Sequence, residues 1–316
     1  AAIMRRAFKI ANEAPAGPVF VALPINVMEQ ETEILAKAST DTFTAPRPDP
    51  AGVAAMAARI MAAKNPIIVA SDDVARADAV KDLVALSEAM GAGVWFEGIR
   101  HHINFPNRHP NAKGILPVDA GAIRNTFGEA DLVMLIGGPF FEEVWFTSGL
   151  PFPDGATVVQ LEEAAARLAH NHAVDAGLVG HLPTSLGDLT ATLKASGDYQ
   201  SAAKARNDAL AAESTEARAA YEARSQRAWD RDPMSMARAM AEINAGTPDN
   251  AVVVEEAITA GLDLAQAFEF STPGDYLSGR GGGIGQGLAG AIGAKQGQPE
   301  RPVLAVSGDG SAMYSI

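Results

Sequence analysis

Short apolar segments alternate with helical segments between residues 51 and 195, and this alternation constrains the fold more than any other feature of the sequence. Chains with this alternation pair their strands in parallel and cover both faces of the sheet with helices. We therefore expect one complete, three-layer α/β domain of the Rossmann-like type over residues 51–195. The expected strands are 66–70, 94–96, 132–136 and 157–161, and the expected helices are 51–63, 77–90, 120–127 and 182–193.

The segments before residue 51 are too small to enclose a core. Residues 1–13 carry apolar side chains at helical spacing, and residues 19–23 read as a buried strand. One helix and one strand cannot form a core, so we expect residues 1–34 to be the end of a domain whose remainder lies outside this sequence. Three prolines between positions 46 and 50 indicate a stiff linker over 35–50.

Residues 196–231 separate the α/β domain from a further region. They are rich in Ala, Glu and Arg without a clean apolar stripe, which favours a solvated linking helix. Beyond them the pattern predicts a helix at 236–243 and strands at 251–254 and 303–306. We expect residues 232–316 to be the opening part of another domain with a parallel sheet.

The tripeptide Gly308-Asp309-Gly310 follows the last expected strand and is the strongest indication of chemistry. Glycines let a backbone turn sharply and approach a ligand closely. The carboxyl end of a parallel strand is where open α/β sheets bind ligands, and one carboxylate with phosphate oxygens is the usual way to hold Mg²⁺. Gly-Asp-Gly also forms ordinary turns, but its position here predicts a site for Mg²⁺ and phosphate at Asp309.

A glycine loop opens into the helix expected after it. Five of the seven residues from Gly279 to Gly285 are glycine, and apolar residues at helical spacing follow. Such a loop exposes backbone N–H groups that favour an anionic ligand. Residues 285–290 also match the dinucleotide pattern GxGxxG, although close packing of the helix on a sheet explains small residues equally well. An NAD(P)-binding dehydrogenase is the corresponding alternative, disfavoured because no apolar strand leads directly into the pattern.

The composition excludes several other classes of protein. Acidic residues number 38 against 25 basic ones, and no basic stripe is present, so we expect no nucleic-acid partner. The absence of cysteine rules out disulfides, thiolate zinc sites and cysteine nucleophiles, and it fits a cytoplasmic protein. No apolar run approaches the roughly 18 residues that cross a bilayer, so we expect no membrane partner.

The histidines and a cluster of aromatic residues are further candidates. The pairs His101-His102 and His170-Asn171-His172 could in principle bind a transition metal. No carboxylate at helical spacing accompanies them, so hydrogen bonding in loops is the expected role. Residues 140–146 hold three phenylalanines and Trp145, for which packing in a core or interface is expected rather than ligand binding.

Taken together, these segments resemble the thiamine-diphosphate-dependent 2-oxo acid decarboxylase and acetolactate synthase superfamily, most closely its benzoylformate decarboxylase-like members. The matching stretches are 5–8, 17–19, 105–110, 136–140, 282–285, 299–301, 308–312 and 314–316. The resemblance implies a pyrimidine-binding domain ending at residue 34, a central domain over 51–195 and a diphosphate-binding domain that opens at residue 232. It also implies a homodimer or homotetramer with the active site between subunits.

The resemblance implies thiamine diphosphate and Mg²⁺ as cofactors and gives the matching residues roles. Asp309 would bind the Mg²⁺ that bridges the diphosphate. Ile284 would hold the cofactor in its bent shape, and the Gly282 carbonyl would accept a hydrogen bond from the aminopyrimidine. The implied cofactor-binding residues are Gly282, Gly283, Ile284, Gly308, Gly310 and Ser311, and the implied metal ligand is Asp309.

The implied reaction is the decarboxylation of a small 2-oxo acid by a lyase, through a C2 carbanion and an enamine. An acetolactate synthase-like carboligase is the alternative within the family, and a flavin-dependent oxidase is disfavoured because residues 51–195 lack a dinucleotide fingerprint. The family's catalytic groups and second metal ligand fall outside this sequence, which keeps open a non-catalytic fragment or nucleotide-binding protein on the same fold. Benzoylformate decarboxylases also place a catalytic histidine where this sequence has Val144, which puts a phenylglyoxylate substrate in doubt.

Overall fold

The computed structural model describes residues 2–35, 37, 39, 44–280 and 282–316. Its strands are β1 (Pro66–Ala70), β2 (Gly93–Phe96), β3 (Ala112–Ile115), β4 (Leu132–Ile136), β5 (Thr157–Glu162), β6 (Ala176–Val179), β7 (Val252–Glu256), β8 (Tyr276–Ser278) and β9 (Val303–Ser307). Its helices are α1 (Ala2–Asn12), α2 (Ile25–Met28), α3 (Pro50–Ala62), α4 (Asp73–Arg76), α5 (Val80–Met90), α6 (Ala120–Phe127), α7 (Leu182–Lys194), α8 (Gly197–Arg227), α9 (Met236–Gly246), α10 (Gly261–Ala267), α11 (Gln286–Gly297) and α12 (Asp309–Ala312), with a 3₁₀ turn at Ala165–Arg167.

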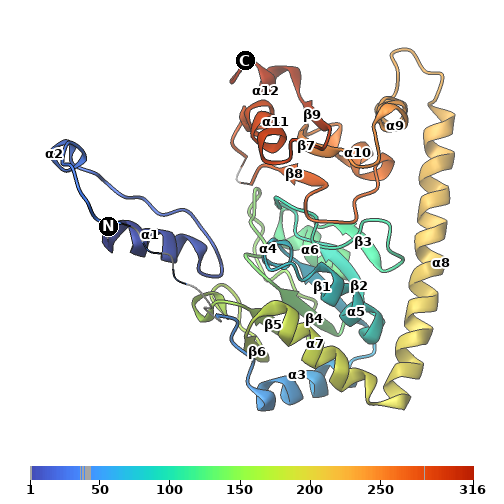
Figure 1. Ribbon diagram of the computed structural model, residues 1–316. Coiled ribbons are helices and arrows are strands. Elements are labelled where there is room, and N and C mark those ends of the chain that lie inside the picture. Colours follow the sequence, from blue (N-terminus) through green and yellow to red (C-terminus); the bar gives the residue numbers. More distant parts are fainter. Residues whose placement is uncertain (1, 36, 38, 40–43, 281) are drawn as a thin grey trace.

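The described strands form two parallel sheets (Figure 1). The larger sheet has the order β3-β2-β1-β4-β5-β6, and the smaller has the order β8-β7-β9. All strand pairs within both sheets are parallel. The α/β class with parallel sheets, which the sequence predicts, is therefore confirmed, whereas the domain boundaries drawn from the sequence stay predictions.

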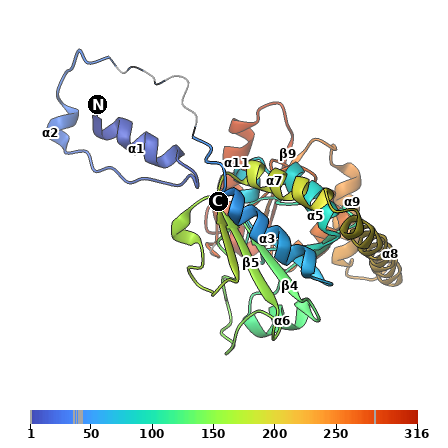
Figure 2. The ribbon, with the colours of Figure 1, turned by 90° about the horizontal axis from the view of Figure 1, so that it is seen from below.

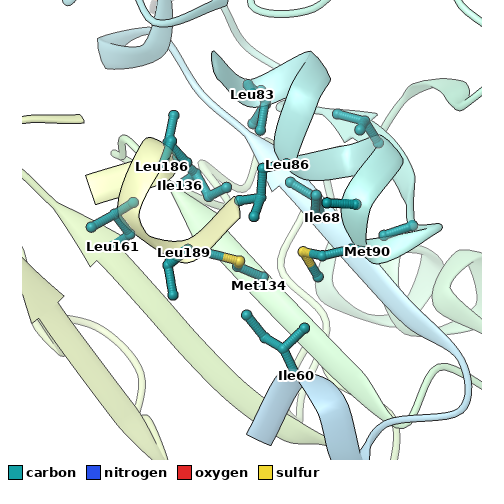
Figure 3. Packing of buried hydrophobic residues seen from close by; sticks show 14 of the residues in the cluster. Ile60, Ile68, Leu83, Leu86, Met90, Met134, Ile136, Leu161, Leu186 and Leu189 are labelled. Carbon is teal, nitrogen blue, oxygen red and sulfur yellow. The ribbon is translucent and has the colours of Figure 1, made fainter. Parts of the chain in front are cut away.

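Helices cover both faces of the six-stranded sheet, with α3, α5 and α7 on one side and α6 on the other (Figure 2). On the first side, the fully buried side chains of Ile68 and Met134 pack in the largest core cluster (Figure 3). On the other side, Val69 and Val133 pack against α6. Successive residues of a strand point to opposite faces. Because both faces are buried here, β1 and β4 are continuous apolar runs rather than alternating ones.

The 31-residue helix α8 runs along the side of the molecule from the larger sheet to the smaller (Figure 1). Its first turns pack on α5, where Tyr199 and Ala203 are buried. Gly91, with φ +58°, ends α5 so close to α8 that an added Cβ would lie 2.4 Å from the Ala203 carbonyl oxygen. Most of the remaining helix is exposed and polar. None of the helices in the described part of the chain combines the length and apolar character that a membrane span requires.

Two expectations before residue 91 differ from the structure. Residues 19–23 form no strand, and Phe20 is 92% exposed. A strand needs a neighbouring backbone to bond, and no described strand lies beside this segment. The helix expected at 77–90 begins only at Val80, because Asp78 has a φ of 55° and separates α4 from α5. Part of the linker expected at 35–50 lies outside the described residues.

The connection from β2 to β3 joins the two sheets. Ile103, which is 1% exposed, lies in the core cluster of the smaller sheet, together with residues of α9, α10 and β7. The Asn107 side chain accepts a hydrogen bond from the Phe270 N–H at 2.8 Å. Its amide group donates to the carbonyls of Ala265 and Phe268 at 3.1 and 3.0 Å. The larger sheet therefore contributes residues to the core of the smaller one.

Glu97, directly after β2, is a buried carboxyl group that is only 2% exposed. Its Oε2 accepts the N–H of Phe141 at 3.1 Å. Burial raises the pKa of Glu97 to about 7. Because this folded-state pKa exceeds the unfolded value of about 4.3, folding favours the protonated form. The contribution of Glu97 to stability is therefore full below about pH 4 and is lost as the pH rises toward about 7.

The Glu97→Gln variant should remove this pH dependence while keeping an oxygen for the Phe141 N–H. Between about pH 5 and pH 8 the wild type should lose roughly 3 kcal/mol of unfolding free energy relative to the variant. Urea unfolding at both pH values measures the difference, with the exposed Glu129→Gln as the matched control. The same pH dependence in the wild type and Glu97→Gln would contradict the assignment.

The Met134→Ala variant tests the larger core. Met134 is fully buried at the centre of β4, so its truncation should lower the unfolding free energy by about 2–5 kcal/mol. Met61, on the outer side of α3, is 36% exposed, and its change to Ala should cost less than about 1 kcal/mol. Urea unfolding followed by circular dichroism compares the two variants. Equal losses of unfolding free energy in the two variants would show that Met134 is not buried in the core.

Candidate functional site

The carboxyl ends of β7 and β9 lie side by side, because the two strands pair in parallel with Glu256 opposite Ser307. Gly308 follows β9 directly and precedes α12, which begins at Asp309. Asp309 is exposed. The carboxylate is therefore located where the sequence predicts it, at the end of a parallel strand and open to a ligand.

Glu256, the last residue of β7, joins the segments that meet at this edge. Its carboxylate accepts hydrogen bonds from the backbone N–H groups of Gly285, Gln286 (3.1 Å) and Gly287 (3.0 Å) and from the Ser307 hydroxyl (3.3 Å). Burial acts to raise the pKa of Glu256, but the three backbone N–H groups outweigh it and hold the pKa below its ordinary value. One carboxylate therefore fixes the start of α11 against the ends of β7 and β9.

Two glycines allow these close contacts. A Cβ on Gly287 would lie 2.7 Å from the Cβ of Glu256, closer than real Cβ atoms approach each other. A Cβ on Gly285, whose φ is +95°, would lie 2.9 Å from the Cβ of Tyr314. The end of the glycine loop therefore touches both the carboxylate of β7 and the segment that follows Asp309.

These contacts correct the expectation of a free helix N-terminus. The first N–H groups of α11 are bonded to Glu256, so they are not available to an anionic ligand as the loop pattern predicts. The expectation that no strand leads directly into the GxGxxG match is confirmed, because β8 ends at Ser278 and residues 279–284 separate it from Gly285. A dinucleotide places its pyrophosphate on these N–H groups. The carboxylate in that place disfavours the dehydrogenase alternative.

Part of the glycine-rich backbone faces open space. Apart from its own neighbours along the chain, no described residue lies within 4 Å of a Cβ built on Gly282, Gly283 or Gly310. Gly282 has a left-handed φ of +69°, and the Ile284 side chain is 55% exposed. A ligand can therefore approach the backbone at Gly282, Gly283 and Gly310, whereas the Gln286 side chain covers Gly279 and Tyr314 covers Gly285.

Few polar side chains surround this opening. Ser311 is half-buried, and its hydroxyl would lie 3.6 Å from a Cβ built on Gly308. Among the described residues, no three His, Cys, Asp or Glu side chains gather into a metal site. A cation bound at Asp309 would therefore have at most two such side chains from the described residues and would take its other ligands from water, backbone or a bound anion.

The histidines have structural contacts. The Nδ1 of His101 lies 2.8 Å from the Ser278 carbonyl oxygen. His172 packs edge-on against Phe141 and Phe152 with ring centroids 5.5 and 5.3 Å apart, and burial lowers its pKa. The expected role in loop hydrogen bonding is confirmed for His101, whereas His172 acts through aromatic packing.

The resemblance places the histidine of benzoylformate decarboxylases at Val144. The backbone of Val144 is held by a hydrogen bond, but its side chain is exposed to solvent. The Val144 N–H donates to the Val118 carbonyl at 3.0 Å, and its side chain is 55% exposed. Trp145 and Phe146 are also exposed, while Phe140 is buried in the core beside α6. The expectation of packing in a core or interface is therefore confirmed as core packing for Phe140, whereas an interface role for the exposed Trp145 and Phe146 stays a prediction.

Two contacts at the site were not predicted from the sequence. One is the role of Glu256, and the other is an ion pair in which Nη1 of Arg280 lies 2.8 Å from Asp72. The available signals were a pair of acidic residues at a strand end and a single cation inside a glycine loop. Neither signal predicts which residue is contacted, because Gly285 and Gly287, the partners of Glu256, and Asp72, the partner of Arg280, are distant in the sequence.

Comparisons with known proteins agree with this geometry. Residues 53–189 match the family model "Thiamine pyrophosphate enzyme, central domain", and residues 256–316 match "Thiamine pyrophosphate enzyme, C-terminal TPP binding domain". The chain is 29% identical to benzoylformate decarboxylase of Pseudomonas aeruginosa over 315 residues, which is 99% of this chain and 56% of that protein. It is 28% identical to a probable acetolactate synthase of Mycobacterium bovis over 322 residues, covering 99% of this chain and 55% of that protein.

A solved structure shows the same fold. Benzoylformate decarboxylase of Polynucleobacter necessarius superimposes with a TM-score of 0.76 at 24% identity, over 99% of this chain and 56% of that one. The chain thus spans about half the length of the relatives that it matches. The two family models follow each other in chain order and together cover more than half of the sequence. The resemblance stated from the sequence is confirmed, and the protein belongs to the thiamine pyrophosphate-dependent enzymes.

Proposed function

We propose that the protein is a lyase that uses thiamine diphosphate and Mg²⁺ to remove CO₂ from a small 2-oxo acid. The observation that carries this proposal is the meeting of the exposed Asp309 with an open glycine loop at the carboxyl ends of β7 and β9. The similarity to a benzoylformate decarboxylase supports chemistry on 2-oxo acids. Because the chain spans about half of that relative, the activity of the whole protein is part of the proposal.

The residues at the end of β9 fit a diphosphate with its metal ion. Mg²⁺ is usually held by one or two carboxylates together with phosphate oxygens, and Asp309 provides one exposed carboxylate. Gly310 leaves space for phosphate oxygens, and the Ser311 hydroxyl provides a donor beside Gly308. We assign Asp309 to the metal and Gly308, Gly310 and Ser311 to the diphosphate.

The glycine loop fits the other end of the cofactor. No described residue except their chain neighbours lies within 4 Å of a Cβ built on Gly282 or Gly283, which leaves room for a ligand beside them. We assign the Gly282 carbonyl to a hydrogen bond from the aminopyrimidine. The exposed Ile284 side chain provides an apolar support against which a bent cofactor can rest. When bound, the thiazolium ring supplies the electron sink that lets CO₂ leave a 2-oxo acid.

Glu256 determines where the diphosphate can bind. Its carboxylate occupies the N–H groups at the start of α11 and places a negative charge there. Like charges close together are destabilising, so this carboxylate disfavours an anionic ligand at the start of α11. At the start of α12, Mg²⁺ bound to Asp309 would offset the negative charge and allow a diphosphate to bind. In this proposal the metal-diphosphate end of the site is separate from the loop that holds the pyrimidine.

A carboligase of the acetolactate synthase type is the second candidate. One feature favours it: the resemblance implies that Val144 stands where benzoylformate decarboxylases have a catalytic histidine. A probable acetolactate synthase matches 99% of this chain, the same share as the benzoylformate decarboxylase, so this match does not separate the two. Product analysis after incubation with pyruvate or benzoylformate separates the candidates, because a decarboxylase releases an aldehyde and a carboligase joins two substrates. A homodimer or homotetramer with a shared active site, and a cytoplasmic location, stay predictions.

The Asp309→Ala variant tests the metal assignment. Calorimetry with thiamine diphosphate and Mg²⁺ should show affinity lower than that of the wild type by more than about ten-fold, because the cation loses its carboxylate ligand. Asp208→Ala, an equal change on the exposed face of α8, should bind like the wild type. Undiminished binding by Asp309→Ala would overturn the assignment, and no binding by the wild type would overturn the proposed function.

The Glu256→Gln variant tests the carboxylate at the start of α11. Because the folded-state pKa is lowered, the charge of Glu256 stabilises the protein above its unfolded pKa of about 4.3, and this stabilisation is lost as the pH falls through the folded pKa. At pH 7 the variant should be less stable than the wild type by about 1 kcal/mol, and the gap should close below about pH 4. Urea unfolding between about pH 3 and pH 7 measures the difference in unfolding free energy between the wild type and Glu256→Gln. The exposed Glu269→Gln is the control. A gap that is independent of pH would refute a charge effect.

A further inference from the structure

The side chain of Arg280 crosses from the glycine loop to the larger sheet. Its Nη1 donates to Asp72 Oδ2 at 2.8 Å, and its Nε donates to Glu142 Oε1 at 3.2 Å. The Asp72 side chain is fully buried, and that of Arg280 is only 13% exposed. None of the cofactor roles assigned above uses this contact.

Asp72 is a fixed anchor for this arginine. It lies at the carboxyl end of β1 and accepts the backbone N–H groups of His101 at 2.9 Å and His102 at 3.3 Å. The same segment holds the end of β8, because the Ser278 N–H donates to the His101 carbonyl at 2.9 Å. Removing one partner of such a buried pair is strongly destabilising.

The glycine loop is therefore held at two ends by carboxylates from different sheets. Asp72 holds Arg280 at the start of the loop, and Glu256 holds Gly285 at its end. Gly282 and Gly283 lie between these anchors, and no described residue except their chain neighbours lies within 4 Å of a Cβ built on either. A glycine-rich segment has much backbone freedom to lose on binding. Anchoring both ends reduces that loss before a ligand arrives, which increases affinity.

We propose that Arg280 is a positioning residue, through which Asp72 and Glu142 of the larger sheet order the glycine loop for the cofactor. The proposal rests on the proposed function, since it makes the affinity for thiamine diphosphate depend on a contact that the cofactor does not touch. In this arrangement the six-stranded sheet contributes to cofactor binding without supplying a ligand.

The test compares Arg280→Met and Arg280→Lys with a matched control, Arg47→Met. Arg47 also pairs with an aspartate, Asp188 of α7, at 2.9 Å, but the Arg47 side chain is 74% exposed. Arg280→Met should bind thiamine diphosphate with Mg²⁺ roughly ten-fold more weakly, and Arg280→Lys should recover part of the loss. Without cofactor, amide hydrogen exchange over 282–287 should be faster in Arg280→Met and unchanged in Arg47→Met.

Two results would overturn the proposal. One is wild-type affinity and wild-type loop exchange in Arg280→Met. The other is exchange that rises equally in β7, β9 and the loop, which would mean that Arg280 only holds the sheets together. Glu142→Gln, which removes the more exposed arm of the contact, provides a milder variant that should shift loop exchange in the same direction. If the wild type binds no thiamine diphosphate, the proposed function fails, while the exchange experiment still decides whether Arg280 orders the loop.

Discussion

The carboxylate of Glu256 is the interaction on which the candidate site depends. Parallel pairing of β7 and β9 places Glu256 beside Ser307, and its carboxylate accepts hydrogen bonds from the first backbone N–H groups of α11. Because it satisfies the N–H groups of that turn, the helix needs no ligand at its start. In the proposed function, the diphosphate binds instead with Mg²⁺ at Asp309, beside the open position of Gly310. The structural contact of Glu256 would thereby determine at which strand end the cofactor binds.

The two sheets meet through the carboxyl ends of their strands. Asp72 follows β1 and Arg280 follows β8, so their ion pair joins the edges at which open α/β sheets bind ligands. The β2–β3 connection strengthens this contact, because Ile103 lies in the core of the smaller sheet and Asn107 bonds to three of its backbone groups. The glycine loop is located between these two edges, within reach of both.

The sequence predicts the parts of the fold that local pattern determines. Strands β1 and β4 are apolar on both faces and are readily identified, and so is the aspartate after β9. The strands β3, β6 and β8 have only three or four residues and carry Gly or polar side chains, so they have no distinct pattern. Residues 19–23 have the pattern of a strand but no described neighbour to pair with. The partners of Glu256 and Arg280 depend on tertiary contacts and cannot be read from spacing.

A crystal structure of the protein with thiamine diphosphate and Mg²⁺ is the decisive measurement for the proposed site. We predict Mg²⁺ at about 2.1 Å from an Asp309 carboxylate oxygen, with the diphosphate beside Gly308 and Gly310. Glu256 should still accept the N–H groups of Gly285 and Gly287. A diphosphate bound on the start of α11, with Glu256 displaced and no metal at Asp309, would contradict the account.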